Sequence, residues 1–213
     1  AHLVTRVTLV RHGRTAWNAI ARIQGQTDIP LDDTGRWQAQ RMGQALAGED
    51  IAIVYTSDLA RAADTAQALV DALGVPLETD SRLRERHFGS FEGLTFAELD
   101  EHHVDAARRW RTREPGFAPE GGESLIDFNQ RSVDAVTRLA RRHAGHHIAV
   151  VSHGGVLDAM YRAGSRVPLE QARSWHIGNA SIHRMMLSAE GWTIVGWNDE
   201  FHLDDNLDAN RDD

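Results

Sequence analysis

The sequence contains no cysteine. It also contains no lysine, since all 23 of its Lys and Arg positions are arginine. Without cysteine, disulfides, thiolate metal sites and cysteine-based phosphatase chemistry are excluded. Without lysine, Schiff-base enzymes and P-loops, which need a lysine, are excluded too. No apolar run approaches the ~20 residues of a membrane-spanning helix, and no signal-peptide pattern is visible. We therefore expect a cytoplasmic protein that is not bound to a membrane.

The charge balance is acidic, with a formal net charge of −8. This charge argues against nucleic acid as the main partner. The 213 residues suffice for one large domain with a sizeable core. Strand-like and helix-like stretches alternate without an internal repeat or a low-complexity linker, which predicts a mainly parallel sheet with helices on both faces. We expect a single α/β domain over residues 1–213.

The most informative stretch lies at the start of the chain. Thr8-Leu9-Val10 is a short apolar run that predicts a buried strand, and it ends in Arg11, His12 and Gly13. Open α/β folds bind ligands at the carboxyl ends of parallel strands. Arginine offers a planar fork to phosphate oxygens, histidine offers a nucleophile near neutral pH, and glycine lets backbone N–H groups approach an anion. The pattern therefore indicates a phosphate site.

A second strand end repeats this pattern. Residues 147–151, which are apolar after His147, predict a second buried strand and precede Ser152, His153 and Gly154. A single histidine after a strand would usually be structural, but a second histidine–glycine pair at a strand end indicates a shared site. A serine-hydrolase elbow is excluded because Val150 stands where that motif needs glycine.

Arg61 is a further candidate for phosphate binding. The apolar spacing after the predicted strand 51–55 indicates a helix that starts near Ser57, so Arg61 falls near its first turn. Helix N-termini favour anions, and an arginine there is poorly placed unless a phosphate binds beside it. A surface arginine is the alternative.

Several blocks of the chain together resemble the histidine phosphatase superfamily, also called phosphoglycerate mutase-like. The blocks are Leu9-Val10-Arg11-His12-Gly13-x-Thr15-x-x-Asn18, Gln24-Gly25-x-x-Asp28-x-Pro30-Leu31, Ser57-Asp58-Leu59-x-Arg61-Ala62, Leu83-Arg84-Glu85-Arg86-His87-Phe88-Gly89-x-Phe91-Glu92-Gly93 and Ser152-His153-Gly154. The resemblance implies a three-layer α-β-α fold whose sheet is mainly parallel with one antiparallel edge strand.

The resemblance also implies a mechanism. It identifies His12 as the nucleophile that forms a phosphohistidine and Glu85 as the general acid and base. Arg11, Arg61 and His153 then hold the phosphate. The implied enzyme is a metal-independent phosphomonoesterase that acts on small phosphorylated metabolites and needs no cofactor.

Other side chains have weaker assignments. Asn18, Gln24 and the backbone of Gly154 are expected at the phosphate. Glu123 stands where the family often has a carboxylate near the substrate, but an acidic residue there also suits the N-terminus of the helix that Ser124 is expected to cap.

Two further positions stay open. Glu92 is the alternative acid to Glu85, with structural hydrogen bonding as its other interpretation. Arg14 replaces the glutamate or glutamine that is usual in the signature, which leaves the polarity at the rim of the site undecided.

Residues 94–122 are loop-rich and are expected to form a lid or cap. The arginine-rich stretch 108–113 within them could hold an acidic substrate, although such a run is more often a solvated helix face.

Alternative functions remain at this point. A phosphoglycerate mutase would share the core residues, and a phospho-ligand binding protein without catalysis or a metallophosphatase is less favoured. The adjacent pairs His102-His103 and His146-His147 are poor metal ligands because neighbouring residues rarely face one ion. The substrate stays undetermined beyond a small phosphomonoester, and a homodimer is possible.

Overall fold

A computed structural model describes residues 3–204 and contains one six-stranded sheet. Its order is β3-β2-β4-β1-β5-β6. The strands are β1 (Thr5–Arg11), β2 (Ile53–Thr56), β3 (Leu77–Thr79), β4 (His147–Ser152), β5 (Ile182–Ser188) and β6 (Gly191–Asp199). β1, β2, β3 and β4 run parallel, and β5 runs against its neighbours β1 and β6. The predicted mainly parallel sheet with an antiparallel edge is confirmed, and the β5–β6 hairpin forms that edge.

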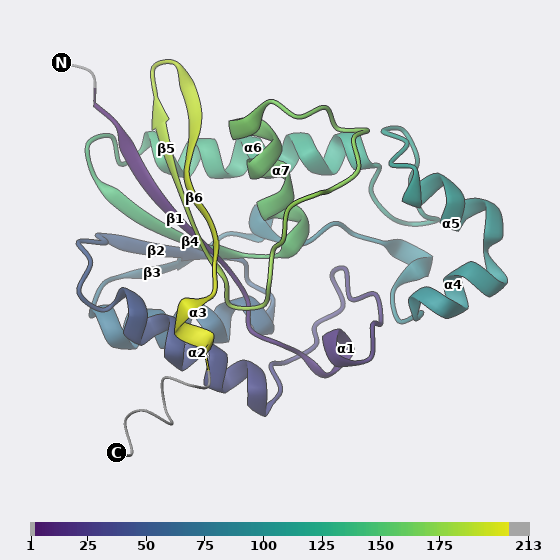
Figure 1. Cartoon of the computed structure of the whole chain (residues 1–213), viewed down its shortest axis with the longest axis horizontal. Coiled ribbons are helices and arrows are strands. Elements are labelled where there is room, and N and C mark those ends of the chain that lie inside the picture. The colour runs from purple at the N-terminus through teal and green to yellow at the C-terminus, as the bar shows by residue number, and fades with distance from the viewer. Residues whose placement is uncertain (1–2, 205–213) are drawn as a thin grey trace.

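Helices cover both faces of this sheet (Figure 1). On one face lie α2 (Asp33–Leu46) and α3 (Ala60–Leu73). On the other lie α6 (Leu125–Arg141) and α7 (Gly154–Ser165). Every residue of β4 is buried, which explains its continuous apolar run, since a central parallel strand meets helices on both sides. The three-layer prediction is confirmed.

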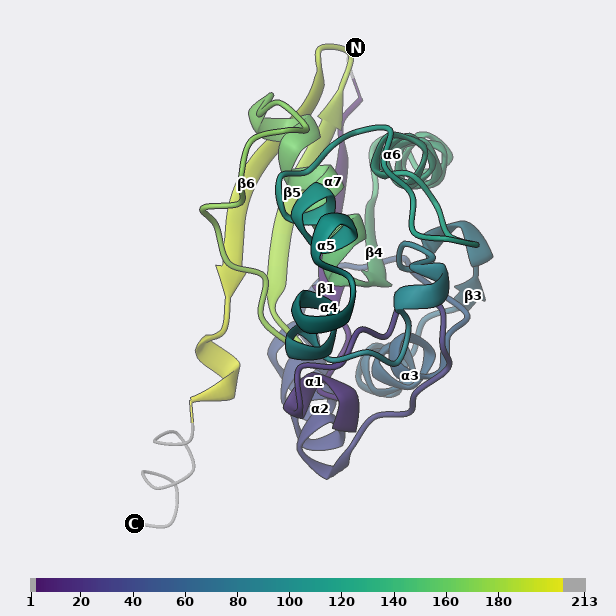
Figure 2. The ribbon, with the colours of Figure 1, turned by 90° about the vertical axis from the view of Figure 1, so that its right-hand side faces the viewer.

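The region at residues 94–122 leaves the sheet (Figures 1 and 2). It contains α4 (Phe96–His102) and α5 (Val104–Arg111), and it packs through a small core of its own. That core consists of Ile23, Phe91, Leu99, Ala107 and Phe117. These helices therefore rest on a few buried side chains outside the main core, and a lid role for residues 94–122 stays a prediction.

The remaining elements are short. They are α1 (Ala16–Ala19) and the 3₁₀ turns η1 (Ser81–Leu83), η2 (Gly89–Phe91) and η3 (Phe201–Leu203). Ser124 caps α6 as predicted, accepting the Asp127 N–H at 3.2 Å. Within residues 3–204, no helix has the length and apolar character needed to cross a bilayer.

Candidate active site

The sheet itself brings the two strand-end motifs together. β1 and β4 are neighbours in parallel, with Arg11 opposite Ser152, so both strands deliver their following histidines to the same edge. The rings of His12 and His153 lie 5.2 Å apart, centroid to centroid. The N–H of His12 also donates to the Ser152 carbonyl at 3.1 Å, which ties the two loops at their start.

His12 has the form that a nucleophile needs. It is 2 % exposed, and its Nδ1 lies 2.6 Å from the Gly13 carbonyl oxygen. Because a carbonyl only accepts, Nδ1 carries the proton and Nε2 keeps its lone pair. Burial, followed by the charges of Arg61 and Arg11, holds the pKa of His12 well below its ordinary value. The imidazole is therefore neutral near pH 7, with Nε2 ready to attack.

Three buried nitrogens around His12 have no hydrogen-bond partner in residues 3–204. They are Nε of Arg11, Nε of Arg61 and Nδ1 of His153. Buried polar groups almost always have partners, so three such donors around one side chain are a strong indication of an anion site. A phosphoryl group carries the acceptor oxygens that these donors lack.

Backbone carbonyl groups hold the guanidiniums of Arg11 and Arg61 in place. Arg61 donates to the carbonyls of Gly25 at 2.6 Å and Thr27 at 2.8 Å, and Arg11 donates to the Ile177 carbonyl at 2.7 Å. Arg61 is 1 % exposed, so the interpretation of it as a surface arginine is wrong. Burial lowers the pKa of Arg11 to about 10, which still leaves it charged at neutral pH.

Ser57 orients His153, and it was not predicted as a site residue. Its Oγ lies 2.8 Å from His153 Nε2 and also accepts the Leu59 N–H at 3.3 Å. When the hydroxyl donates to Nε2, the proton of the neutral imidazole lies on Nδ1, the nitrogen that has no partner within residues 3–204. The helix predicted to start near Ser57 begins three residues later, at Ala60, with Leu59 as its N-cap.

Glu85 faces this site from an irregular segment. Its Oε1 accepts the Arg86 N–H at 2.8 Å and its Oε2 accepts the Gly155 N–H at 3.0 Å. A Cβ at position 155 would lie 2.1 Å from Glu85 Oε1, so any larger residue there would displace the carboxylate from this position. Glu92, the alternative acid, is structural: its carboxylate accepts from Gln26 N–H, Thr27 hydroxyl and Phe88 N–H.

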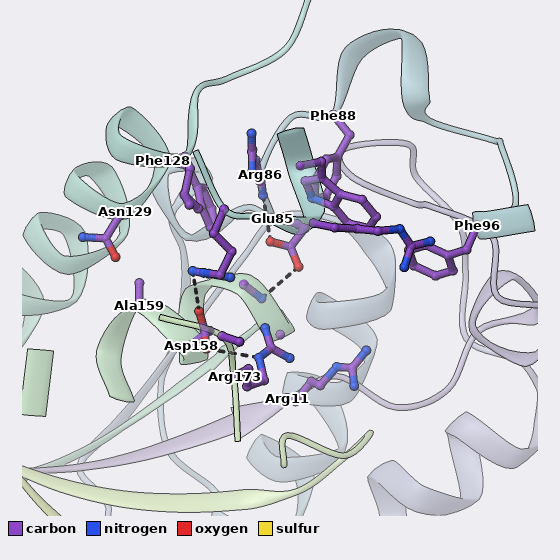
Figure 3. A pocket seen from close by; sticks show the side chains of 17 residues that line it. Arg11, Glu85, Arg86, Phe88, Phe96, Phe128, Asn129, Asp158, Ala159 and Arg173 are labelled. Atoms are coloured by element: carbon purple, nitrogen blue, oxygen red, sulfur yellow. Dashed lines mark hydrogen bonds and ion pairs between the residues drawn. The ribbon is translucent and has the colours of Figure 1, made fainter. Parts of the chain in front are cut away.

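Two adjoining cavities meet at Glu85. The smaller, of about 290 Å³, contains the Arg11, His12 and Arg61 side chains in its lining, and we call it the phosphate pocket. The larger, of about 570 Å³, we call the outer cleft (Figure 3). Residues common to both linings are Arg11, Glu85, Phe88, Phe96 and Trp110. A molecule with its phosphate at His12 can therefore extend past Glu85 into the outer cleft.

The outer cleft carries more positive than negative charge. Its lining adds Arg86, Arg111, Arg113 and Arg173 to Arg11, against the carboxylates of Glu85 and Asp158. Asp158 is 6 % exposed in its side chain and is already shared by Arg113, Arg162 and Arg173, two of which line the cleft (Figure 3).

Arg86 is the buried cation of this cleft. It is 4 % exposed and donates only to backbone carbonyls, those of Glu123 at 3.1 Å and Phe117 at 3.0 Å. Burial lowers its pKa to about 10, so it remains charged. Arg86 lies beside Glu85 in the motif that identified the acid, which is the signal that could have found it.

The other predicted residues divide between the site and its surroundings. Asn18 and Gln24 both line the phosphate pocket, and Gly154 begins α7 and lines the outer cleft. The side-chain oxygen of Asn18, Oδ1, accepts from the Thr15 N–H at 3.0 Å and from Asn179 Nδ2 at 3.3 Å, and these bonds orient the side-chain NH₂ group of Asn18. Asn179, which the sequence did not indicate, also donates to the His12 carbonyl at 3.2 Å.

The structure does not bring Glu123 to the substrate. It lines neither cavity and instead pairs with Arg131 at 2.7 Å. The expectation that Glu123 lies near the substrate is therefore wrong, because its carboxylate forms an ion pair with Arg131 of α6 instead. Arg14 also turns away, toward Asp32 at 2.7 Å and Thr34 at 3.1 Å.

The arginine-rich stretch is mostly a surface feature. Arg108 pairs with Asp105 and Arg109 with Glu114. Arg111, although paired with Asp100, and Arg113 line the outer cleft as well. In the part of the chain that the structure describes, no group of three or more histidine, aspartate or glutamate side chains is arranged to hold a metal ion.

Comparison with known proteins agrees with this geometry. Residues 7–200 match the model of the histidine phosphatase superfamily (branch 1). The metal-independent phosphoserine phosphatase of Arabidopsis thaliana is 38% identical over 205 residues, which are 94% of this chain and 84% of that protein. A glucosyl-3-phosphoglycerate phosphatase of Mycolicibacterium vanbaalenii is 38% identical over 189 residues, 84% of this chain and 82% of the relative. The solved structure of Bacillus stearothermophilus YhfR has a TM-score of 0.88 at 32% identity, covering 94% of this chain and 100% of that one.

Proposed function

Since the chain belongs to the histidine phosphatase superfamily, branch 1, we propose that it hydrolyses small phosphomonoesters without a metal ion through a phosphohistidine on His12. The observation that carries this proposal is the set of three unpartnered buried donors around the lone pair of His12. Those donors suit the oxygens of a phosphoryl group, and the neutral imidazole suits attack on its phosphorus.

In the first step, Nε2 of His12 forms a bond to phosphorus while the bond from phosphorus to the alcohol oxygen breaks. Glu85, acting as the general acid, gives a proton to that leaving oxygen. In the second step, the Glu85 carboxylate takes a proton from a water molecule. The water oxygen attacks phosphorus, the N–P bond breaks, and orthophosphate leaves with His12 and Glu85 restored.

Arg11, Arg61 and His153 stabilise the charge that the phosphoryl oxygens carry during both transfers. Because the donors are already fixed by Ile177, Gly25, Thr27 and Ser57, little reorganisation accompanies the reaction. The two guanidiniums also keep His12 unprotonated, so the same charges bind the phosphate and preserve the nucleophile.

The outer cleft supports a narrower substrate class. Its guanidiniums outnumber its carboxylates, and its aromatic wall of Phe88, Phe96 and Trp110 suits the carbon skeleton of an alcohol. Two relatives are named for phosphoserine and for glucosyl-3-phosphoglycerate, which both carry a carboxylate beside the phosphate. We propose that the alcohol part of this substrate also carries a carboxylate, bound near Arg86 and Arg173.

The test is a hydrolysis screen over phosphorylated metabolites in the presence of a chelator. The panel contains phosphoserine, 3-phosphoglycerate, sugar phosphates and nucleoside monophosphates. We expect phosphate release with the chelator present, and an acid-labile phosphate on the wild-type protein after rapid quenching. We expect His12→Ala to lose at least about 10⁴-fold in turnover, since the covalent route needs this side chain.

The control is His102→Ala, which removes an exposed histidine outside both cavities and should leave turnover unchanged. Near-normal activity of His12→Ala would reject the covalent mechanism. Interconversion of 2- and 3-phosphoglycerate that depends on the bisphosphate would instead show a mutase.

A further inference from the structure

The segment that carries Glu85 has little regular structure to hold it. Glu85 lies between the 3₁₀ turns η1 and η2, outside every strand and α-helix. Within residues 3–204, the hydrogen bonds that hold the carboxylate come from the N–H groups of Arg86 and Gly155. Its position therefore depends on how firmly the backbone around residue 85 is anchored, and no sheet ladder anchors it.

One side chain from α6 supplies most of the anchor, beside Gln26 Nε2, which donates to the Glu85 carbonyl at 3.2 Å, and Ser152 Oγ, which donates to the Leu83 carbonyl at 2.6 Å. Arg131 donates through Nη1 to the carbonyls of Arg82 at 2.7 Å and Arg84 at 2.9 Å, and through Nη2 to the Glu85 carbonyl at 3.2 Å. Its two remaining donors reach both oxygens of Glu123, Nε at 3.0 Å and Nη2 at 2.7 Å. A guanidinium has five N–H donors, and all five are used here.

Glu123 completes the arrangement from the other side. Its Oε1 accepts the His87 N–H at 2.8 Å, and its own N–H donates to the His87 carbonyl at 2.8 Å. Burial raises the pKa of the Glu123 carboxyl, but the hydrogen bonds from Arg131 and the His87 N–H, together with the positive charge of Arg131, outweigh burial, and the pKa lies below its ordinary value. The pair is ionised, and neither member lines the phosphate pocket or the outer cleft.

We propose that Arg131 and Glu123 form a clamp that positions Glu85 for proton transfer, by fixing the backbone on both sides of it. This inference rests on the proposed function, in which Glu85 is the general acid and base. The clamp touches no substrate, so both residues are positioning residues. A shift of about 1 Å in a reacting group can cost about 10²-fold in rate, which makes rigid support of this segment valuable.

The clamp predicts a defect that depends on the leaving group. An alkyl phosphate needs a proton on its departing oxygen, so a displaced Glu85 slows the first step. A p-nitrophenyl phosphate has a leaving group that departs without this proton, so its first step is spared and only water attack on the phosphohistidine is slowed. A general loss of structure would slow both steps, because His12 and the phosphate donors would suffer equally.

The experiment compares Arg131→Met, Arg131→Lys and Glu85→Gln with the wild type. The matched control is Arg138→Met, which removes an exposed arginine from the same helix. For Arg131→Met we expect kcat on an alkyl phosphate to fall by about 10- to 100-fold. KM should change little, and the rapid burst of p-nitrophenol should keep its amplitude. Arg131→Lys, which keeps the charge but lacks the fork, should lie between the wild type and Arg131→Met.

The outcomes separate the clamp from the function on which it rests. If Glu85→Gln hydrolyses alkyl phosphates at the wild-type rate, the acid–base assignment and the clamp both fall. If Glu85→Gln is slow but both Arg131 variants are not, only the clamp falls. Loss of the burst together with turnover in Arg131→Met would show a merely structural role and overturn positioning.

Should Arg131→Met fail to fold, Glu123→Gln provides the same test. This substitution keeps the three hydrogen bonds from Arg131 to the backbone carbonyls possible. It weakens the two-bond ion pair between Arg131 and residue 123. A selective loss on alkyl phosphates in this variant supports the clamp, and wild-type rates on both substrates contradict it.

Discussion

The phosphate pocket and the outer cleft differ in what builds them. In the pocket, Arg11 and His12 lie at the end of β1 and Arg61 near the start of α3, and the sheet and its helices hold them in fixed relation, while residues 17–25 and the residues shared with the cleft complete the lining. The cleft is lined partly by the core helices α6 and α7 and partly by the segment after η1, the helices α4 and α5, and the loop that carries Arg173. The nucleophile and the phosphate-binding arginines thus lie on the rigid part of the fold, whereas Glu85 and most of the proposed substrate contacts lie on parts that change more easily between relatives.

Removing a charge from the phosphate pocket should affect every substrate. Arg61→Gln deletes a buried guanidinium beside His12, and removal of one such electrostatic donor costs about 10²–10³ in rate. We expect kcat/KM to fall by that factor for phosphoserine and for a simple alkyl phosphate alike. Steady-state kinetics on both substrates measures it.

Stability has to be followed in this variant, because the Gly25 and Thr27 carbonyls lose their donor. Circular dichroism at the assay temperature shows whether the variant is folded. A loss restricted to one substrate would contradict the uniform role of the pocket.

Removing a charge from the outer cleft should instead change selectivity. Arg173 is 40% exposed in its side chain and pairs with Asp158 at 3.1 Å, so it can be replaced with little effect on folding. Hydrogen bonds to charged groups contribute about 1.5–3 kcal/mol. We therefore expect Arg173→Met to lower kcat/KM for phosphoserine by about tenfold, and by much less for an alkyl phosphate without a carboxylate.

The ratio of the two kcat/KM values is the measurement that matters here. An equal fall on both substrates would place Arg173 at the phosphate rather than at the alcohol. If Arg173→Met leaves kcat/KM unchanged for both substrates, the proposal that the substrate carries a carboxylate bound by Arg173 would be contradicted.

The sequence predicted the pocket better than the cleft for a physical reason. Arg11, His12 and His153 lie at or just after the ends of apolar strands, and neighbouring parallel strands bring the residues at their carboxyl ends to one edge of the sheet. Arg173 lies in the stretch between α7 and β5, where no periodicity indicates what the side chain will face. Its role appears only when the loop folds over Asp158.

Glu123 shows a different limit of the sequence. Its position in the chain is that of a residue near the substrate, but eight positions later α6 presents Arg131 to its carboxylate. A helix and the loop before it decide this pairing in three dimensions. Ser57 is similar, since its hydroxyl looked like a helix start and instead holds His153.

The smallest effect is expected at Arg14, which is near His12 in sequence but belongs to neither cavity. Its side chain is 41% exposed and its charge is paired with Asp32, which also caps α2. Exposed ion pairs contribute about 0–1 kcal/mol. We expect Arg14→Gln to lower the free energy of unfolding by less than about 1 kcal/mol, and to leave kcat/KM within about twofold for both substrates. Urea denaturation and the same kinetic assays test this. A tenfold change in kcat/KM would show that Arg14, the residue that departs from the family signature, influences the reacting phosphate. Arg14 would then have to be counted among the residues of the phosphate pocket.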